Sequence, residues 1–349
     1  MTNSSRSLLV VTPYFFPHLG GVEKHVLETS LLLKRAGWQV EIITKQHEPD
    51  LPRSEKQDDL TVHRFSFAKI KCLGLIFLWA RLLQQYWRLF KNAPVIHVHD
   101  VMIWVLPFRI LMPRKKFILT MHGWEGIFPL PKKNIWLKKL SAILANQVIC
   151  TGEYISRHYQ VSCEAVAEGG VSESFVKLVQ RSATKNKTTD LLYVGRLAPD
   201  TGLPVLLTAL AQLEARSAKV TVKFAGDGEL RGECEQWGDV LGWQDEAQLA
   251  KQLTKAKTCL AGGYLAALEA LVAGCQVIVV AEHQLKNDYW QLSSLAKNIE
   301  VVESAEKMAS LLKKTSIDTW NRSAISPKQL LKRYGWQQVV KLYLEQYSG

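Results

Sequence analysis

The sequence predicts an α/β protein made of two domains, each built on a doubly wound parallel sheet. Short runs of aliphatic and β-branched residues alternate with longer amphipathic stretches, which is the pattern of β-α-β units. This alternation stops in a polar segment, residues 180–190, and then restarts. A length of 349 residues favours two domains over one, and 47% apolar residues suffice for real cores.

In the first half, continuous apolar runs predict buried strands and helical periodicity predicts helices. Residues 21–37 form an amphipathic pattern that ends at Gly37, and residues 79–90 form a second helical pattern. The expected strands are 7–12, 38–44, 60–65, 94–100, 116–123, 145–152 and 164–170.

After residue 190 the same alternation returns. The expected strands are 191–196, 219–226, 257–263, 276–282 and 298–304. The expected helices are 203–215, 227–237, 264–274 and a terminal amphipathic one, 336–347. We therefore predict a first domain over 1–176, a second over 177–334, and a C-terminal helix over 335–349 that is able to return to the first domain. A ligand crevice is expected between the domains, at the carboxyl ends of the strands.

The net charge of +12 is concentrated in one region. Residues 64–139 hold 14 basic and only 2 acidic residues, which favours an anionic partner. Trp79, Trp87 and Phe90 lie among these charges and suit a surface that faces anionic lipid. An ordinary helix packed on the sheet, with its basic side chains solvated, explains the pattern equally well. No nucleic-acid partner is expected, because the aromatic spacing matches no base-stacking module.

The cysteines and apolar runs bear on the compartment. Six cysteines, at 72, 150, 163, 234, 259 and 275, form no C-x-x-C pair, so we expect free thiols in a reducing compartment. The longest apolar run, 72–80, stops at Arg81, well short of the about 20 residues that cross a bilayer. The N-terminal apolar run is too short for a signal peptide. We expect a cytoplasmic protein, with a peripheral position on the inner face of the plasma membrane as one option.

Two loops of the first domain carry candidate functional residues. Gly20 and Gly21 lie between a Pro- and aromatic-rich loop and a helix, where they allow either close backbone approach to an anion or a simple tight turn. His122 follows a strand that should end at the crevice, although a lone histidine is more often structural. His97 and His99 form an H-x-H pair with no third ligand spaced to support it, so we interpret them as strand and pocket residues and predict no metal site.

Two further loops lie in the second domain. Arg196 follows a strand and a glycine, and its planar guanidinium suits a phosphate. Gly262 and Gly263 precede a helix whose leading N–H groups are able to face a diphosphate. Glu269 lies about two turns further on. An acid in so apolar a helix calls for a salt bridge or for a ligand such as the vicinal hydroxyls of a ribose. A dehydrogenase is disfavoured, because no G-x-G-x-x-G follows the first strand.

These motifs, in this order, resemble the family 4 retaining glycosyltransferases of the GT-B fold. The resemblance covers nearly the whole chain. Each motif is weak alone, and their order and spacing carry it. The matching segments are PHLGGVE (17–23), GWQVEIIT (37–44), TMHG (120–123), GRLAPDTG (195–202), GDG (226–228), AGGYLAALEALVAGCQV (261–277) and YGWQQVVKLYLEQY (334–347).

The resemblance implies roles for individual residues. Gly20 and Gly21 would lie against the donor diphosphate or the reacting sugar, and His122 beside the transferred sugar. Arg196 would neutralise the diphosphate leaving group, and Glu269 would hold the ribose. The segments that would border the nucleotide carry Gly226, Gly228, Gly242, Gly262 and Gly263. The resemblance implies no metal and no cofactor beyond the nucleotide-sugar co-substrate. No D-x-D occurs in the chain, which agrees.

Two positions depart from the family pattern. The family's lysine in the G-R-L block falls at Thr201, which removes a positive charge from the diphosphate site. The first glutamate of the Glu-x7-Glu pair, which usually contacts the donor sugar, falls at Ala261. Lys286 is a candidate to compensate for the missing lysine. The departures imply either rearranged donor contacts or weakened or lost activity.

The expected function is a metal-independent, retaining glycosyltransferase acting in cell-envelope polysaccharide or lipopolysaccharide biosynthesis. It would move a sugar from a nucleotide diphosphate to a glycan or lipid-linked acceptor. A non-catalytic protein that binds a nucleotide sugar or a partner is the first alternative, for which Ala261 and Thr201 argue. A GT-B sugar-nucleotide epimerase is the second, and the G-R-L and L-E-A blocks fit it less well.

Overall fold

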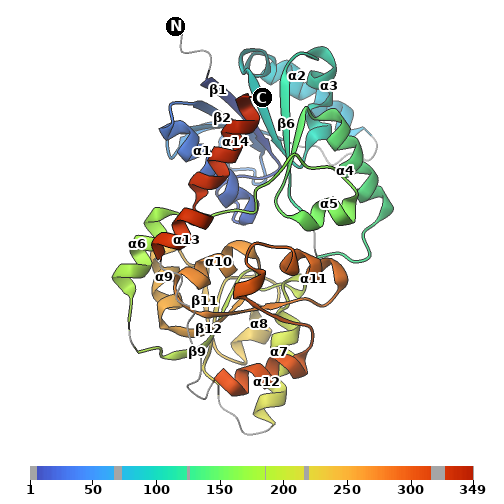
Figure 1. Ribbon diagram of the computed structural model, residues 1–349. Helices are drawn as coiled ribbons and strands as arrows, with labels where there is room; N and C mark the ends of the chain where they lie inside the picture. The colour runs from blue at the N-terminus through green and yellow to red at the C-terminus, as the bar shows by residue number, and fades with distance from the viewer. Residues whose placement is uncertain are drawn as a thin grey trace. The chain divides into compact units, whose positions relative to one another are not determined.

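The computed structural model describes residues 6–66, 73–123, 126–184, 186–215, 220–315 and 327–348. The chain forms two compact units (Figure 1). The first comprises Met1–Gly123, Leu130–Glu168 and Trp336–Gly349, and the second comprises Trp124–Pro129 and Gly169–Gly335. The chain therefore passes into the second unit at residue 169, a few residues before the boundary drawn from the sequence, because helix α6 (Glu173–Ser182) packs on α9 (Glu246–Lys255).

The first unit is built on an eight-stranded sheet in the order β3-β4-β2-β1-β5-β6-β7-β8. Its strands are β1 (Ser7–Thr12), β2 (Gln39–Lys45), β3 (Ser54–Gln57), β4 (Leu60–Phe65), β5 (Val95–His99), β6 (Lys116–Met121), β7 (Gln147–Cys150) and β8 (Ala165–Val166). All neighbours pair in parallel except β3 and β4. The strand order reverses at β1, which lies between β2 and β5, and ligands of such sheets bind beyond the carboxyl ends of the strands at this point.

Helices cover both faces of this sheet (Figure 1). They are α1 (Gly21–Arg35), α2 (Gly74–Asn92), α3 (Leu106–Leu111), α4 (Lys132–Leu144), α5 (Glu153–Tyr159) and α14 (Trp336–Ser348). In α2 the buried side chains recur every fourth residue, at Leu78, Leu82, Tyr86 and Phe90, so one side of the helix faces the core. The Phe90 ring stacks on Phe108 of α3, with centroids 3.6 Å apart.

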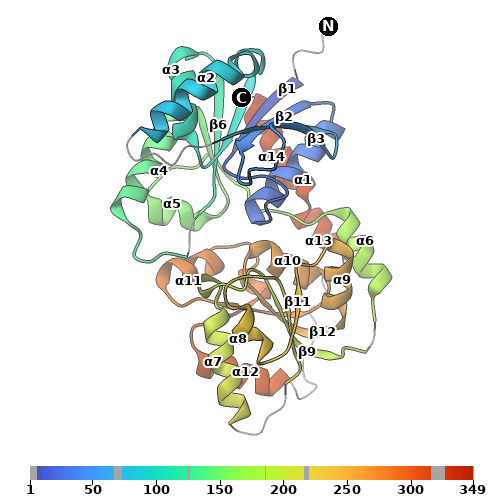
Figure 2. The same ribbon diagram turned by 180° about the vertical axis from the view of Figure 1, so that it is seen from behind.

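The C-terminal helix α14 belongs to the first unit and packs along α1 (Figures 1 and 2). Trp336 is almost fully buried, and its ring lies edge-on to His25 of α1 with centroids 5.1 Å apart. Tyr343 and Tyr347 are also buried. The last turns of the chain therefore complete a core formed mainly by residues at the opposite end of the sequence.

The second unit has a six-stranded parallel sheet in the order β11-β10-β9-β12-β13-β14. Its strands are β9 (Thr189–Val194), β10 (Val222–Ala225), β11 (Asp239–Gly242), β12 (Ala256–Ala261), β13 (Gln276–Val280) and β14 (Glu300–Val302). Its other α-helices are α7 (Leu203–Glu214), α8 (Arg231–Glu235), α10 (Tyr264–Val272), α11 (Gln284–Gln291), α12 (Ala305–Thr315) and α13 (Pro327–Tyr334). Here the order reverses at β9, between β10 and β12.

The predicted fold class, two α/β units with doubly wound parallel sheets, is confirmed. Several predicted elements are shorter than expected. Strands β7, β10 and β14 cover about half of the predicted strands 145–152, 219–226 and 298–304. The helix expected over 227–237 is only α8, because Gly226 and Gly228 have φ values of 153° and 154° that hold the chain in a loop. The strand expected over 164–170 is only β8. The edge strand β3 was not predicted, since its sequence, SEKQ, carries no apolar signal.

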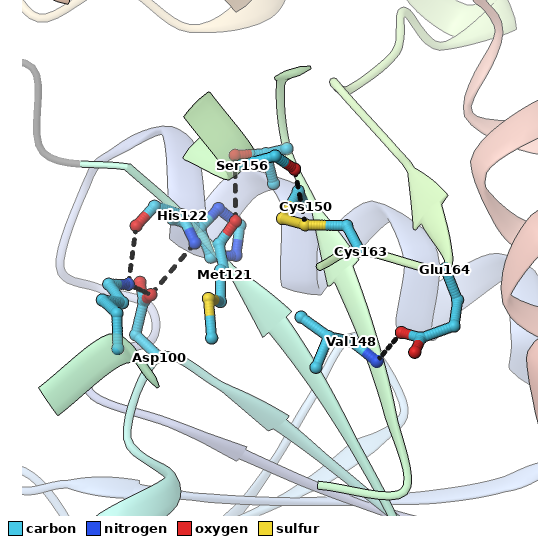
Figure 3. Close-up of a disulfide and its surroundings, with 10 residues drawn as sticks. Asp100, Met121, His122, Val148, Cys150, Ser156, Cys163 and Glu164 are labelled. Atoms are coloured by element: carbon cyan, nitrogen blue, oxygen red, sulfur yellow. Dashed lines mark hydrogen bonds and ion pairs between the residues drawn. A yellow bond between two sulfur atoms is a disulfide. The ribbon is translucent and has the colours of Figure 1, made fainter. Parts of the chain in front are cut away.

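The prediction that all six cysteines are free thiols is wrong for two of them. Cys150 at the end of β7 and Cys163, just before β8, form a disulfide with Cα atoms 5.9 Å apart (Figure 3). The pairing of β7 with β8 brings these residues together, and no spacing motif signals it. Cys234, Cys259 and Cys275 are buried and belong to no disulfide, and Cys72 lies outside the described residues.

Among the residues that the structure describes, no helix combines the length and the apolar character that a bilayer span needs.

Candidate functional site

The loop between β1 and α1 carries the first candidate glycines. Gly20 caps α1 in an extended conformation, and a Cβ atom there would lie 2.4 Å from Oε2 of Glu23. The Glu23 carboxylate is buried and accepts a hydrogen bond from Nδ1 of His18 at 2.8 Å. Gly20 therefore leaves room for an acid folded back over the start of α1. Gly21 is the first residue of that helix.

His122 follows β6 and is held by its backbone as well as by its ring. Its N–H donates to Oδ1 of Asp100 at 3.0 Å, and its carbonyl accepts from Nζ of Lys138 at 3.0 Å. Lys138 of α4 also pairs with Asp100. Asp100 follows β5 with φ of 63°, a left-handed conformation that aspartate tolerates better than most residues. The ends of two neighbouring strands are thus joined around His122.

Four imidazole rings gather at these strand ends: His25 of α1, His97 and His99 of β5, and His122. Nδ1 of His99 hydrogen-bonds Nε2 of His122 at 3.0 Å, and the rings of His97 and His99 stack with centroids 4.6 Å apart. Burial lowers the pKa of His25 and of His97 to about 3. Burial, followed by the neighbouring histidines, also holds the pKa values of His99 and His122 well below the usual value, and Lys138 adds to the effect at His122.

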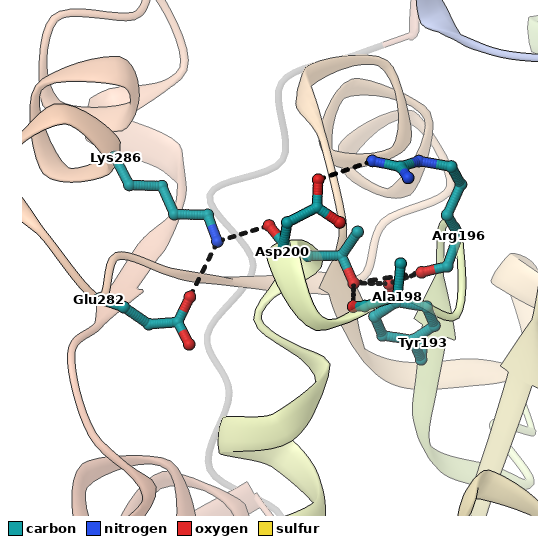
Figure 4. Close-up of polar contacts among 7 residues, drawn as sticks. Tyr193, Arg196, Ala198, Asp200, Glu282 and Lys286 are labelled. Carbon is teal, nitrogen blue, oxygen red and sulfur yellow. Dashed lines mark hydrogen bonds and ion pairs between the residues drawn. The ribbon is translucent and has the colours of Figure 1, made fainter. Parts of the chain in front are cut away.

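In the second unit, Arg196, which is labelled in Figure 4, lies just beyond β9. Strand β9 is the one at which the strand order reverses. Its side chain is 60% exposed and donates to Oδ2 of Asp200 at 2.8 Å. The Tyr193 hydroxyl donates to the Arg196 carbonyl at 2.6 Å. The backbone of this loop is therefore fixed by a side chain of β9, while the guanidinium is exposed to solvent.

Gly226 and Gly228 are explained by backbone packing against the Arg196 loop. A Cβ atom on Gly226 would lie 1.8 Å from the Gly195 oxygen, and one on Gly228 would lie 2.5 Å from the Leu197 oxygen. The two loops are also bonded, because the Leu197 N–H donates to the Asp227 carbonyl at 2.9 Å. Gly242 joins the same arrangement by accepting from the Gly226 N–H at 2.9 Å. The glycines thus allow two loops to approach within backbone contact.

We expect Gly226→Ala to destabilise the second unit by at least about 1 kcal/mol, because the new Cβ atom overlaps a carbonyl and the φ of 153° is unfavourable for alanine. The matched control is Gly232→Ala in α8, where a Cβ atom meets nothing within 4 Å. That change should be neutral or slightly stabilising. Urea unfolding of both variants checks this, and equal midpoints would contradict it.

Helix α10 carries the remaining candidates. Gly262 follows β12, and its N–H donates to the Val194 carbonyl at 2.9 Å. Gly263 caps the helix, and a Cβ atom there would meet nothing within 4 Å. The first helical N–H, that of Tyr264, donates to the Tyr289 hydroxyl at 3.0 Å. Glu269 is buried two turns into the helix.

The two departures from the family pattern are both buried. Ala261 ends β12 and is 2% exposed. The Thr201 hydroxyl donates to the Ala198 carbonyl at 2.6 Å and lies 2.7 Å from the Tyr193 hydroxyl, so it closes the turn after Arg196. Lys286 of α11 reaches the same turn. Its Nζ donates to the Asp200 carbonyl at 2.8 Å and to Oε2 of Glu282 at 3.0 Å (Figure 4).

The structure brings Arg196, Gly226, Gly228, Gly242 and Gly262 together around the carboxyl end of β9. In the first unit, Gly20, Gly21 and His122 all lie at carboxyl ends of strands near β1. Their roles toward a ligand stay predictions. Sequence reasoning missed the residues that hold the site, namely Asp100, Lys138, Tyr193, Tyr343 and Glu282. Of these five, only Asp100 stands beside a sequence motif, because it directly follows the H-x-H pair.

The comparisons with known proteins agree with this architecture. The sequence model described as Glycosyltransferase Family 4 matches residues 19–163, so the predicted resemblance is confirmed. The GPI3 subunit of the phosphatidylinositol N-acetylglucosaminyltransferase of Saccharomyces cerevisiae is 23% identical over 382 aligned positions, which cover 98% of this chain and 83% of the relative.

Solved glycosyltransferases share the whole fold. A sucrose-phosphate synthase from Thermosynechococcus elongatus superposes with a TM-score of 0.76 and 16% identity over 98% of each chain. A glycosyltransferase from Rickettsia africae does so with a TM-score of 0.71 and 13% identity, again over 98% of each chain. The fold is therefore GT-B. The family model and the curated relative, rather than these distant structures, support a glycosyltransferase. Within that class, the family 4 match over residues 19–163 identifies the group to which this chain is similar.

Proposed function

We propose that the protein is a retaining glycosyltransferase that moves a sugar from a nucleotide-diphosphate donor to a glycan or lipid-linked acceptor. The observation that carries the proposal is the exposed guanidinium of Arg196, held on a fixed loop at the carboxyl end of β9. A diphosphate leaving group gains charge as the glycosidic bond breaks, and a preorganised guanidinium stabilises that charge. No metal ion is required by this chemistry.

The donor nucleotide would lie along α10 and the glycine loops. Glu269 would accept hydrogen bonds from the ribose hydroxyls, and the open space beside Gly263 would let the diphosphate approach the start of α10. The loop at Gly242 and the half-exposed Trp243 would border the base. These assignments follow the family pattern at the positions that match it.

A thermal-shift screen of nucleotide diphosphates and nucleotide sugars tests this function, followed by donor hydrolysis and transfer assays. We expect one nucleotide class to raise the melting temperature of the protein. Glu269→Gln, which keeps the shape and removes the charge, should weaken nucleotide affinity by about 1.5–3 kcal/mol, or roughly ten- to hundredfold. Unchanged affinity would refute the ribose role of Glu269, and no response to any nucleotide would refute the donor site.

The acceptor is proposed to be lipid-linked, in envelope polysaccharide or lipopolysaccharide assembly. The curated relative, by its name, acts on phosphatidylinositol, and this supports a lipid acceptor. The first unit also exposes large apolar side chains on α2, α3 and α4 among basic residues. They are Ile76, Phe77, Trp87, Ile110, Leu111, Trp136 and Ile143. Such a surface suits peripheral binding to an anionic membrane face, from the cytoplasmic side.

Co-sedimentation with vesicles tests the membrane proposal. We expect binding to vesicles of phosphatidylglycerol and phosphatidylcholine at low salt, and much less at 0.5 M salt, about three times physiological ionic strength. Ile76→Ser with Phe77→Ser should reduce binding, because both side chains are more than half exposed and would enter the interface. Val166→Ser, on the edge strand β8, is the matched control and should bind normally. The absence of binding to anionic vesicles at low salt would contradict the proposal.

A non-catalytic nucleotide-sugar-binding protein is the second candidate, and Ala261 favours it. The residue expected to touch the donor sugar is replaced by a buried methyl group. Stabilisation by a nucleotide sugar without hydrolysis or transfer to any acceptor would favour this candidate over the transferase.

A further inference from the structure

The imidazole cluster of the first unit contains two histidines, His97 and His99, to which the proposed function gives no role. Both are 1% exposed, in a strand whose residues are all buried. Burying a polar ring is unfavourable unless its nitrogens are bonded. Their contacts therefore show what the rings do.

His97 bonds to structural partners on both sides. Its Nδ1 lies 2.7 Å from the Tyr347 hydroxyl of α14, and its Nε2 lies 2.7 Å from the Thr120 hydroxyl of β6. Nε2 of His25 lies 2.7 Å from the Tyr343 hydroxyl, which is 3.3 Å from that of Thr120. These bonds connect α14 to α1 and to the central strands β5 and β6. His97 and His25 therefore have a structural role, which is to fix α14 on the first unit.

His99 is placed differently, because its bonded partner is a candidate substrate-contacting residue. The bond from His99 Nδ1 occupies Nε2 of His122 at 3.0 Å, and the two rings stack with centroids 5.3 Å apart and planes 25° apart. The backbone of His122 is fixed separately by Asp100 and Lys138. The His25 ring lies edge-on to His122, with centroids 5.3 Å apart. Ring and backbone are thus each restrained.

We propose that His99 is a positioning residue: by bonding Nε2 of His122, it fixes the rotation of that ring and leaves Nδ1 as the nitrogen that meets the substrate. This inference rests on the proposed function, in which His122 lies beside the transferred sugar. A single fixed ring presents one donor or one acceptor to a sugar hydroxyl at a set position, and misplacement by about 1 Å can cost about a hundredfold in rate.

The groups around His122 keep its imidazole ring in the neutral form. The groups that face His122 are His25 from α1, His97 and His99 from β5, Asp100 after that strand, and Lys138 from α4. Burial is the largest cause of the lowered pKa of His122, and the adjacent cation and imidazoles act in the same direction. A neutral His122 hydrogen-bonds a hydroxyl without protonating it.

The test compares three substitutions. His99→Phe removes the bond and keeps a planar ring. His99→Asn places an amide atom near the position of Nδ1, so it should restore the bond. His63→Phe removes a histidine from the same sheet, where it bonds Glu41 rather than the cluster, and is the matched control. We expect His99→Phe to lower kcat about ten- to hundredfold with a smaller change in donor KM, and His99→Asn to recover most of that loss. His63→Phe should be active.

A second measurement separates this proposal from the proposed function. In ¹⁵N-histidine-labelled protein, the His122 ring, assigned with His122→Ala, should show one tautomer in the wild type and in His99→Asn. In His99→Phe it should show tautomer exchange. Unaltered His122 signals or unaltered kcat in folded His99→Phe overturns the positioning role. Absence of any transfer by the wild type, with the spectral change intact, overturns the transferase and leaves the positioning role supported by the spectra.

Discussion

Arg196→Ala is expected to lower kcat for sugar transfer by about a hundred- to a thousandfold, the usual effect of removing one preorganised donor to developing charge. Folding should be unchanged, because the Arg196–Asp200 pair is exposed and such pairs contribute about 0–1 kcal/mol. The measurements are kcat and donor KM from a transfer or donor-hydrolysis assay, with melting temperature as the check on folding.

Arg231→Ala is the matched control for this experiment. Arg231 lies in the same unit, its side chain is 44% exposed, and it pairs with Asp227 and Glu235 at spacings of four residues, as Arg196 does with Asp200. It lies beyond the loop formed by Gly226 and Gly228, at the start of α8. Equal losses of kcat in the two variants would show that Arg196 has no special part in stabilising the leaving group.

The turn after Arg196 shows which groups stand where the family pattern has a lysine. Thr201 has used its hydroxyl to close the turn, and the ammonium of Lys286 bonds the Asp200 carbonyl one residue away. Asp200 in turn holds Arg196. The ammonium of Lys286, from α11, therefore contacts the turn at Asp200. In the family pattern the positive charge would come from a lysine at position 201 of the turn itself. The charge of Lys286 is balanced by Glu282, so its first effect is on the position of the turn.

Much of the fold follows from local signals in the sequence. The strands β1, β9 and β13 are continuous apolar runs, and their expected bounds agree with the structure to within two residues. The short or polar elements did not follow. Strand β3 is stabilised by pairing with β4 rather than by burial of apolar side chains, so its sequence carries no period-two pattern.

The site divides in the same way. Motif order and strand ends mark Arg196 and the glycines as candidates in the sequence. The groups that hold them are not marked, because they are brought together by tertiary folding. Tyr343 bonds a histidine 318 positions away, and the Cys150–Cys163 disulfide depends on the alignment of β7 with β8. Neither relation leaves a trace in local spacing.

Lowering the pH from 7.5 to 5.5 is expected to destabilise the first unit by about 3 kcal/mol through His25 and His97 alone. The folded-state pKa of each is lowered to about 3 by burial, whereas an unfolded histidine titrates near 6.5. The unfolded chain therefore binds more protons below pH 6.5. Stability is fully present above that pH and is lost as the pH falls toward 3. Because the unfolded chain takes up these protons only below about pH 6.5, each histidine costs about 1.4 kcal/mol over the whole step from pH 7.5 to 5.5.

Chemical unfolding at the two pH values measures this loss, and two variants locate it. His25→Gln keeps an amide near Nε2, which can still bond Tyr343, and removes one titrating group, so the pH dependence should fall by about 1.4 kcal/mol. His63→Gln removes a histidine outside the cluster, and the pH dependence should persist. A free energy of unfolding that is equal at both pH values would contradict the buried, neutral state of the cluster. Because His99 and His122 shift in the same direction, the same experiment reports on the ring that the proposed chemistry requires to be neutral.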